Sequence, residues 1–150
     1  MRKCSTILVL AAYALLLMEC LVHGIPQLGH YFYGEVVVNK TPAAAGTLIE
    51  AKVLGTTLVY STTVDELGRF GYTSSFRVPG DDLSTPEREG ARNGELIEFY
   101  WNGERMWLFD ASSQSLIGRQ IPFESGETTH LRIDNETPTR VCMPLVVSGR

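Results

Sequence analysis

Alternation of apolar and polar residues with a period of two recurs along most of this chain and constrains its fold more than any other feature. In the segment HYFYGEVVV (30–38), the side chains of Phe32, Val36 and Val38 share one face. The same alternation occurs in TLIEAKV (47–53), LIEFYW (96–101) and THLRID (129–134). Because successive side chains of a strand point to opposite faces, these runs predict half-buried strands. No segment has a helical period of comparable strength.

Turn-forming residues separate these runs at short intervals. Asn-Gly is the strongest of these signals, because both residues tolerate the positive φ of a tight hairpin. Asn102-Gly103 therefore predicts a hairpin over residues 96–109 that joins LIEFYW to ERMWLFD. The pattern gives about seven short strands and no crossover helix, which favours an all-β, antiparallel sandwich of the immunoglobulin-like or transthyretin-like kind.

The N-terminal segment has the pattern of an export signal. A basic start, Arg2-Lys3, precedes the apolar run from Ile7 to Met18, and cleavage before Ile25 is expected. Glu19 interrupts the run well short of the about 20 apolar residues that a spanning helix needs. After signal removal we therefore expect no stable membrane span and a protein that is secreted, either extracellular or on the cell surface. The predicted organisation is a signal peptide at 1–24, a β-sandwich domain at 25–135 and an irregular tail at 136–150.

Composition excludes several kinds of partner and bond. Without residues 1–24, 11 basic residues (13 minus Arg2 and Lys3) face 16 acidic ones (17 minus Glu19). No basic stripe remains to neutralise phosphates, so nucleic acid is not expected as a partner. Of the three cysteines only Cys142 lies outside the signal, which makes an internal disulfide impossible. An unpaired tail thiol is favoured over a bond to another chain.

Reactive motifs are missing from the sequence. Zinc hydrolysis needs two histidines near a carboxylate at ligand spacing. After the signal only His30 and His130 remain, and no HExxH occurs. No nucleophile-elbow motif surrounds a serine, and no glycine-rich phosphate loop is present. We therefore expect no enzymatic activity and no cofactor.

Two stretches carry a family resemblance. YGEVVVNKTPAAAGTLIEAKV (33–53) has a glycine in its first strand, a turn with proline, and Gly-Thr ahead of the second strand. STTVDELGRFGY (61–72) contains the pattern Thr-x-Asp-x-x-Gly-x-aromatic. With these features the chain resembles the carboxypeptidase regulatory-like family, a transthyretin-like β-sandwich related to Cna-B surface repeats, in the form found in exported prokaryotic proteins. The matching turn and core positions are Gly34, Pro42, Gly46, Asp65, Gly68 and Phe70.

The resemblance implies structural roles for these residues. Asp65 would bond to the amides of its own turn, Gly68 would take a positive φ, and Phe70 would enter the core. Because the family is defined by turns and core positions, the resemblance implies a fold and carries no peptidase activity.

Aromatic residues of the predicted hairpin suggest one binding role. Tyr100, Trp101 and Trp107 would cluster around it, and sugars stack on exposed aromatic rings. Trp101 is in phase with Ile97 and Phe99, which favours a place in the core. Trp107 is then expected to pack across the hairpin, and Tyr100 is the ring most exposed.

The segment Val78–Gly94 lacks hydrophobic spacing and is rich in proline, glycine and charge. Asp81 and Asp82 offer the hard oxygen ligands that calcium prefers. A charged connection of this length is more often simply solvated, so we expect a protease-sensitive loop without a metal.

Two sequons, Asn39-Lys40-Thr41 and Asn135-Glu136-Thr137, lie in predicted turns. The side chains of Asn39 and Asn135 are candidate glycosylation sites if the host modifies exported proteins.

The sequence thus predicts a secreted, non-enzymatic β-sandwich module for extracellular adhesion, presentation or assembly. Its partner would be an extracellular protein or a glycan. The alternative is a carbohydrate-binding module that uses exposed aromatic residues of the 96–109 hairpin.

Overall fold

The computed structural model describes residues 27–138, and every regular element in that part of the chain is a β-strand. The expected signal peptide, the cleavage position before Ile25 and Cys142 lie outside the described residues, as does most of the tail at 136–150. Within residues 27–138, no helix has the length and apolar character that crossing a membrane requires.

Twelve strands make up this part of the chain. They are β1 (His30–Val38), β2 (Thr41–Pro42), β3 (Leu48–Val53), β4 (Val59–Thr63), β5 (Arg69–Phe70), β6 (Phe76–Val78), β7 (Leu96–Trp101), β8 (Glu104–Arg105), β9 (Trp107–Asp110), β10 (Leu116–Gly118), β11 (Ile121–Pro122) and β12 (Thr128–Asp134).

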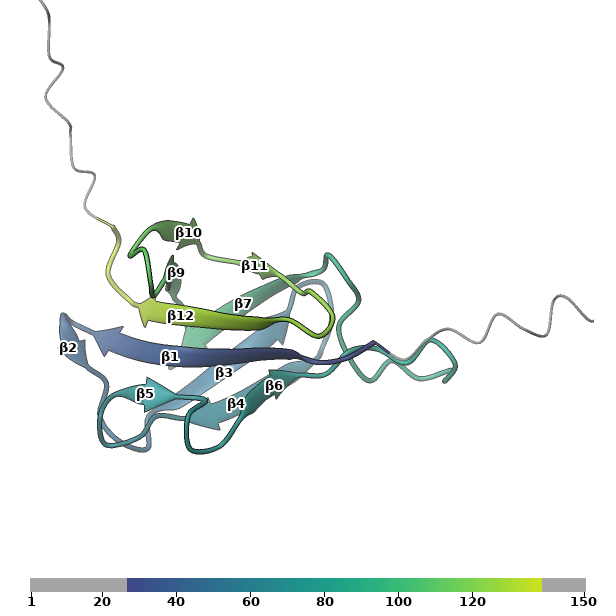
Figure 1. Ribbon diagram of the computed structural model, residues 1–150, viewed down its shortest axis with the longest axis horizontal. Coiled ribbons are helices and arrows are strands. Elements are labelled where there is room, and N and C mark those ends of the chain that lie inside the picture. Colours follow the sequence, from purple (N-terminus) through teal and green to yellow (C-terminus); the bar gives the residue numbers. More distant parts are fainter. Residues whose placement is uncertain (1–26, 139–150) are drawn as a thin grey trace, which may run out of the picture.

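These strands form two sheets that face each other (Figure 1). The seven-stranded sheet has the order β10-β9-β12-β1-β2, with β5 and β6 also paired to β1. The five-stranded sheet has the order β11-β7-β3-β4, with β8 paired to β7. The prediction of an all-β sandwich is confirmed. The expected strand count is too low, because six of the twelve strands have only two or three residues and are too short to show alternation.

The first and last strands, β1 and β12, lie side by side in the seven-stranded sheet and run parallel (Figure 1). This pairing corrects the expectation of a purely antiparallel sandwich. A tight turn can join only antiparallel neighbours, so no local signal announces a parallel pair from opposite ends of a domain. Gly34 permits the close approach of the two backbones, because a Cβ at this position would lie 1.7 Å from the carbonyl oxygen of Leu131.

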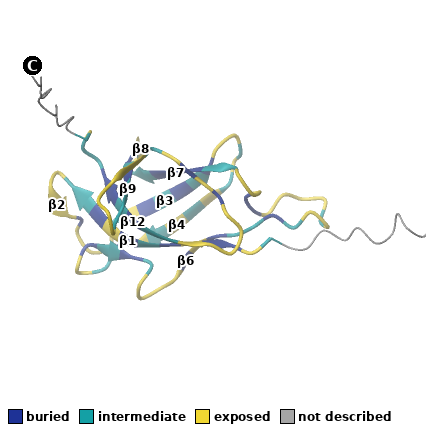
Figure 2. Ribbon diagram, turned by 45° about the horizontal axis from the view of Figure 1, so that its top comes forward, coloured by how far each residue is buried: buried dark blue, intermediate teal, exposed yellow. Residues whose placement is uncertain are grey.

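The core lies between the sheets and is built by the alternation seen in the sequence. Figure 2 shows buried segments on the central strands and exposed segments in the connecting loops. Burial of apolar surface is the main favourable term in folding, so this layer holds the sandwich together. The largest fully buried side chains include Phe32, Phe70, Phe99, Phe123, Ile49, Ile97, Met106, Leu108, Leu131 and Ile133.

The predicted hairpin at 96–109 is correct only in its first half. Asn102 and Gly103 have φ values of 48° and 79°, and they join β7 to β8 as the Asn-Gly signal requires. Met106 then enters the core, and the chain crosses to β9 in the other sheet. A second crossing, between Gly118 and Ile121, returns the chain to the five-stranded sheet. These two crossings close one side of the sandwich.

Candidate binding face

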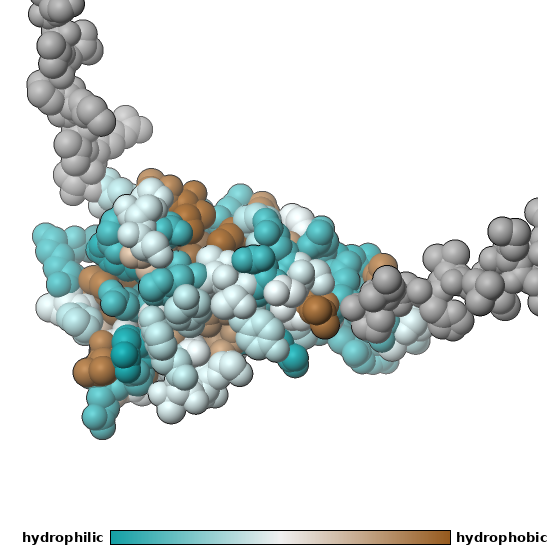
Figure 3. Space-filling model, in the orientation of Figure 1, coloured by the Kyte–Doolittle hydropathy of each residue, from teal (hydrophilic) through white to brown (hydrophobic). Residues whose placement is uncertain are grey.

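The outer surface of the seven-stranded sheet gathers aromatic and charged side chains from strands that are far apart in the sequence. Phe32 and Val36 point into the core, so the odd-numbered residues of β1 point outward. The register places Arg132 between Glu35 and Phe109, which aligns β12 and β9 with β1. We call this surface the outer face; it comprises Tyr31, Tyr33, Glu35, Tyr72, Trp107, Phe109, Arg119, His130, Arg132 and Asp134. Seen from this side, most of the surface is hydrophilic or intermediate, with separate hydrophobic patches (Figure 3).

Three rings form one half of the outer face. The rings of Tyr33 and His130 are stacked, with centroids 4.5 Å apart and planes 1° from parallel. Tyr72 meets Tyr33 edge-on at 5.3 Å, and its hydroxyl lies 3.3 Å from His130 Nε2. The guanidinium of Arg69 covers Tyr72 at 4.9 Å from the ring centroid. Because Tyr72 remains 48% exposed, this half of the face presents an aromatic surface to solvent.

Two guanidinium groups stacked on aromatic rings form the other half. Arg119 lies over Trp107 at 4.3 Å, and Arg132 lies over Phe109 at 5.2 Å. Arg132 also donates hydrogen bonds to Gln114 Oε1 and Asp134 Oδ2 at 3.0 and 2.6 Å.

Buried N–H donors without an acceptor distinguish this half of the face. Three such donors, Trp107 Nε1, Arg119 Nε and Arg132 Nε, have no hydrogen-bond partner among residues 27–138. An unpaired buried donor costs about 1 to 3 kcal/mol, so this half of the face carries a local cost in stability.

A shallow depression of about 580 Å³ adjoins the stacked arginine of β12. The residues that line it carry charges of both signs. Among them, Lys40 Nζ and Glu136 Oε2 form an ion pair at 3.7 Å. Since the lining includes Glu35, Arg132 and Asp134, the depression is polar and suits a hydrogen-bonding partner more than an apolar one.

The three aromatic residues of the predicted hairpin do not form a cluster. Trp101 packs against the core, in line with its phase, whereas Trp107 lies in the other sheet. The expectation that Trp107 packs across the hairpin is therefore wrong, because the chain changes sheets at Met106. Tyr100 donates a hydrogen bond of 2.6 Å to Glu98 Oε2, and Lys52 covers its ring at 4.4 Å. The bond to Glu98, followed by burial, raises the pKa of Tyr100.

The turn motif at 65–70 has the geometry that the resemblance implies. Asp65 Oδ1 accepts the amides of Leu67 and Arg69 at 2.8 and 2.9 Å, and the Arg69 amide is the main cause of a lowered Asp65 pKa. Gly68 has a φ of 76°, and Phe70 is 1% exposed. Gly46 also has a positive φ, 79°, and Pro42 lies in β2. These residues have structural roles, and both oxygens of the Asp65 carboxylate are hydrogen-bonded within the turn.

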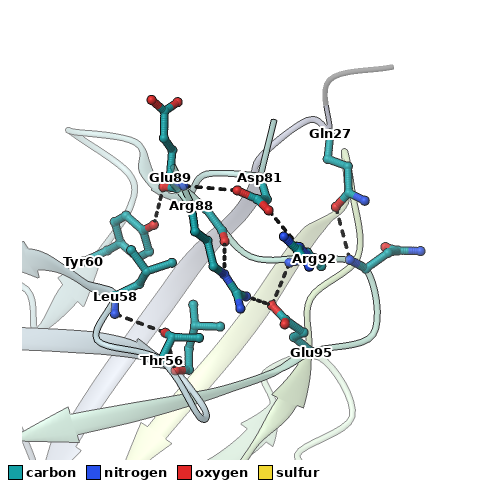
Figure 4. A network of polar contacts seen from close by, with 12 residues as sticks. Gln27, Thr56, Leu58, Tyr60, Asp81, Arg88, Glu89, Arg92 and Glu95 are labelled. Carbon is teal, nitrogen blue, oxygen red and sulfur yellow. Dashed lines mark hydrogen bonds and ion pairs between the residues drawn. The ribbon is translucent and has the colours of Figure 1, made fainter. Parts of the chain in front are cut away.

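The connection at 78–94 differs from the expected solvated loop, because its base is built into the fold. Gly80 and Ala91 form a parallel bridge, and Ala91 is fully buried. The carboxylate of Asp81 is buried and bonds to Arg92 Nε at 2.8 Å and to the Glu89 amide at 3.1 Å (Figure 4). The hydrogen-bonded carboxylate of Asp81, together with the small buried side chain of Ala91, anchors this segment.

The weak calcium candidates are thus engaged in other bonds. Both oxygens of Asp81 have partners within the loop, and Asp82 Oδ1 accepts the amide and hydroxyl of Ser84 at 2.9 and 2.6 Å. In the part of the chain that the structure describes, no group of three His, Cys, Asp or Glu side chains could hold a metal ion.

The two histidines among residues 27–138 lie on opposite sides of the seven-stranded sheet. His130 belongs to the outer face, whereas His30 is 1% exposed and stacks on Phe32 in the core. His30 Nδ1 accepts the Glu124 amide at 3.1 Å, and its Nε2 lies 2.7 Å from Thr129 Oγ1. Burial lowers the pKa of His30 to about 4, and Glu127 offsets only part of this effect. His30 is therefore neutral at pH 7 and structural.

The two sequon asparagines bind each other. The backbone N–H of Asn39 donates to Asn135 Oδ1 at 2.9 Å, and the side-chain Nδ2 of Asn135 donates to Asn39 Oδ1 at 3.1 Å. Asn39 has a φ of 52°, which places its side chain at the turn after β1. Because Nδ2 is the atom that carries a glycan, modification of Asn135 competes with this bond.

Comparison of the chain with protein-family models, with curated proteins and with solved structures finds no match. The family resemblance therefore stays a prediction.

Sequence reasoning missed the outer face as a candidate site. The signal was present in HYFYGEVVV, where Tyr31, Tyr33 and Glu35 alternate with buried positions. The sequence carries no signal that β12 lies beside β1. This pairing brings His130 and Arg132 to the same surface as the tyrosines of β1.

Proposed function

We propose that this chain is a secreted, non-enzymatic β-sandwich module that binds a partner on its outer face, in extracellular adhesion, presentation or assembly. The observation that carries this proposal is the pair of guanidinium groups stacked on aromatic rings, Arg119 over Trp107 and Arg132 over Phe109, on the same face as the exposed ring of Tyr72. Arginine carries several N–H donors, so these groups suit a partner that supplies oxygen atoms. Tyrosine, tryptophan and arginine are also the side chains most enriched at the centres of binding interfaces.

Within this proposal the sandwich is of the transthyretin-like, carboxypeptidase regulatory-like kind. Support comes from the turn at Asp65, the positive φ of Gly68 and the buried ring of Phe70, which have the geometry that the motif implies. Export after removal of residues 1–24 is the further premise, and it rests on the basic start and apolar run of the sequence. Recovery of the mature protein outside the cytoplasm, with an N-terminus near Ile25, tests that premise.

Carbohydrate binding is the second candidate function, and the outer face favours it over the hairpin. Tyr72 is 48% exposed and Tyr31 is 36% exposed, so each offers ring surface for stacking. Tyr100 and Trp101 are both half-buried. A glycan that contacts Tyr72 would also lie beside the guanidinium of Arg69, which stacks on that ring.

A glycan array and a pull-down from the native envelope test both candidates with three forms of the protein. The first is the wild type, and the second carries Tyr72→Ala and Arg119→Gln on the outer face. The control carries Lys52→Gln and Tyr100→Phe on the five-stranded sheet. We expect the wild type and the control to retain the same partner and the outer-face variant to lose it at an unchanged melting temperature. Equal binding by all three forms would contradict the proposal.

The two tryptophans provide a direct readout of the site once a glycan or protein is retained. In ¹⁵N NMR spectra, the indole N–H of Trp107 should shift on saturation with that partner, because the partner changes the surroundings of this ring on the outer face. The indole of Trp101, which packs against the core on the other sheet, should not. A shift of Trp101 alone would place the site on the five-stranded sheet.

A further inference from the structure

One side of the sandwich is open, in contrast to the side closed by the two chain crossings. Here β4 forms the edge of the five-stranded sheet and pairs only with β3. Next to it, β6 pairs only with β1 in the other sheet. β4 and β6 lie side by side without pairing to each other (Figure 1). Each therefore presents an edge to solvent.

The phase of the β3–β4 ladder decides which backbone groups of β4 point outward. Bonds from Val64 N to Thr47 O (3.0 Å) and from Val53 N to Leu58 O (3.2 Å) bracket the ladder. Hydrogen-bonded and non-bonded pairs alternate in an antiparallel ladder, so Tyr60 and Thr62 bond to β3. The alternate residues Val59, Ser61 and Thr63 turn their N–H and C=O groups away from it. β4 pairs with no strand other than β3, and no loop or turn bond among residues 27–138 reaches these outward groups.

The edge of β4 lacks the features that protect most edge strands. Natural proteins blunt exposed edges with charge, proline or bulges, because an open edge pairs with other chains. β4 reads VYSTT, without charge or proline, and its register with β3 continues unbroken from Val59 to Thr63. Val59 is 47% exposed, and no residue of this strand is buried. β4 is therefore an open edge strand with which another extended segment can pair along its whole length.

A groove of about 670 Å³ runs along this edge and carries a single cation, Arg77. Its other lining residues are uncharged: Tyr31, Val59, Tyr60, Ser61, Ser75 and Phe76. Arg77 is exposed and forms no ion pair within the described part of the chain, whereas Arg69, Arg88, Arg92, Arg105 and Arg132 each form one. The groove therefore combines strand-pairing groups with one unmatched positive charge.

We propose that the β4 edge binds an extended segment of a partner protein, which adds a strand to the five-stranded sheet and places an acidic side chain against Arg77. The alternating backbone groups of Val59, Ser61 and Thr63 match a β-strand, and main-chain bonds supply affinity in this mode of recognition. Charge complementarity with Arg77 selects the acidic residue. A second copy pairing through β4 brings no carboxylate to Arg77, because that strand has none. This surface meets the outer face at Tyr31, which lines the groove, but β4 belongs to the five-stranded sheet and the proposal does not depend on the function of the outer face.

Fluorescence anisotropy with labelled peptides tests the proposal. The probe is a seven-residue peptide of alternating threonine and valine with a central glutamate, compared with the same peptide carrying a central lysine. We expect the glutamate peptide to bind the wild type, and the lysine peptide to bind about tenfold more weakly. Arg77→Glu should reverse this preference. Equal binding of both peptides, or no binding of the glutamate peptide at millimolar concentration, would overturn the proposal.

Backbone variants separate strand addition from charge attraction alone. Ser61→Pro removes an outward N–H that the β3 ladder does not use, so the protein should still fold, as proline is tolerated at such edge positions. This variant should lose peptide binding, and Ser61→Ala should keep it. If circular dichroism shows Ser61→Pro to be unfolded, hydrogen exchange of the wild-type protein tests strand addition instead. Saturation with the glutamate peptide should then slow exchange at the amides of Val59, Ser61 and Thr63, and unchanged rates there would exclude strand addition.

The state of association distinguishes a partner strand from a second copy. We expect the purified domain to sediment as a monomer. A dimer that Ser61→Pro dissociates would show that β4 pairs with itself, and it would overturn the assignment of a foreign acidic strand.

Discussion

The carboxylate of Asp81 and the guanidinium of Arg92 form an ion pair across the base of the 78–94 connection, with 2.8 Å between Oδ2 and Nε. The Asp81 side chain is 2% exposed, whereas the Arg92 side chain is half in solvent. Tyr60 of β4 and Glu95 beside β7 join the same network, so the loop is tied to the five-stranded sheet (Figure 4). A buried carboxylate with both oxygens hydrogen-bonded therefore anchors a segment that has few hydrophobic side chains.

Replacing Asp81 should therefore destabilise the domain. Asp81→Asn keeps the size of the side chain but removes the charge, so we expect a loss of about 1 to 3 kcal/mol in the free energy of unfolding. Asp82→Asn is the matched control, because the side chain of Asp82 bonds only to Ser84, within the loop. Urea unfolding at pH 7 measures both. Equal stability of the two variants would show that burial of Asp81 contributes nothing.

Limited proteolysis should separate the tip of the loop from its base. We expect trypsin to cleave after Arg88 before it cleaves after Arg92. Both side chains are bonded, Arg88 to Gly90 O and Glu95, and Arg92 to Asp81. The backbone of Arg92 is held in addition, because its amide bonds to Glu95 and it follows the buried, bridged Ala91. Mass spectrometry of early fragments identifies the order. The Asp81→Asn variant should be cleaved faster at both positions. Early cleavage at Arg92 in the wild type would mean that the base opens readily.

Calcium should change neither the melting temperature nor this cleavage pattern. A specific site would stabilise the protein by about 2.7 kcal/mol at a free calcium concentration one hundred times the dissociation constant. The oxygens of Asp81 are already bonded to Arg92 and the Glu89 amide. Thermal melting with millimolar calcium or with a chelator makes the comparison. A rise in melting temperature that disappears in Asp81→Asn would contradict this prediction.

Gly34→Ala should be far more disruptive than the same change at Gly103. Both glycines have a positive φ, 151° and 79°, but only at Gly34 would the new Cβ meet backbone, 1.7 Å from Leu131 O. At Gly103 nothing lies within 4 Å, so the cost is the backbone strain alone, about 1 kcal/mol. We expect Gly34→Ala to unfold the domain or separate β1 from β12. Circular dichroism and thermal melting compare the two, and similar melting temperatures would count against the parallel pairing.

His30 should make the fold sensitive to mild acid. The unfolded histidine titrates near its ordinary pKa of 6.5, and burial lowers the folded pKa to about 4. Between these values the unfolded state binds more protons, so stability falls as the pH falls. From neutral pH to pH 5 the loss should reach about 2 kcal/mol. Urea unfolding between pH 7.5 and 5 measures it, and an NMR titration of His30 that gives a pKa near 6.5 would refute the assignment.

Several features of the fold were readable from local sequence. Alternation identified β1, β3, β7 and β12 and the residues that they bury, and Asn102-Gly103 marked a tight turn. These inferences succeed because the period of a strand and the φ of a turn residue depend on the residue itself and its neighbours. Very short strands outside these runs, such as β2, were missed because two residues carry no period.

The sequence by itself determined that the chain is all-β and which side of each long strand faces the core, because burial of alternate apolar side chains sets both. Only the tertiary structure decided which strands are neighbours. Tyr33 and His130 stack because β1 and β12 run parallel, and Asp81 is buried because the chain brings Arg92 back to it. Such contacts join residues with no shared local signal, and their energy appears only when the two sheets are assembled. The composition of each surface, and therefore every candidate site, follows from that assembly.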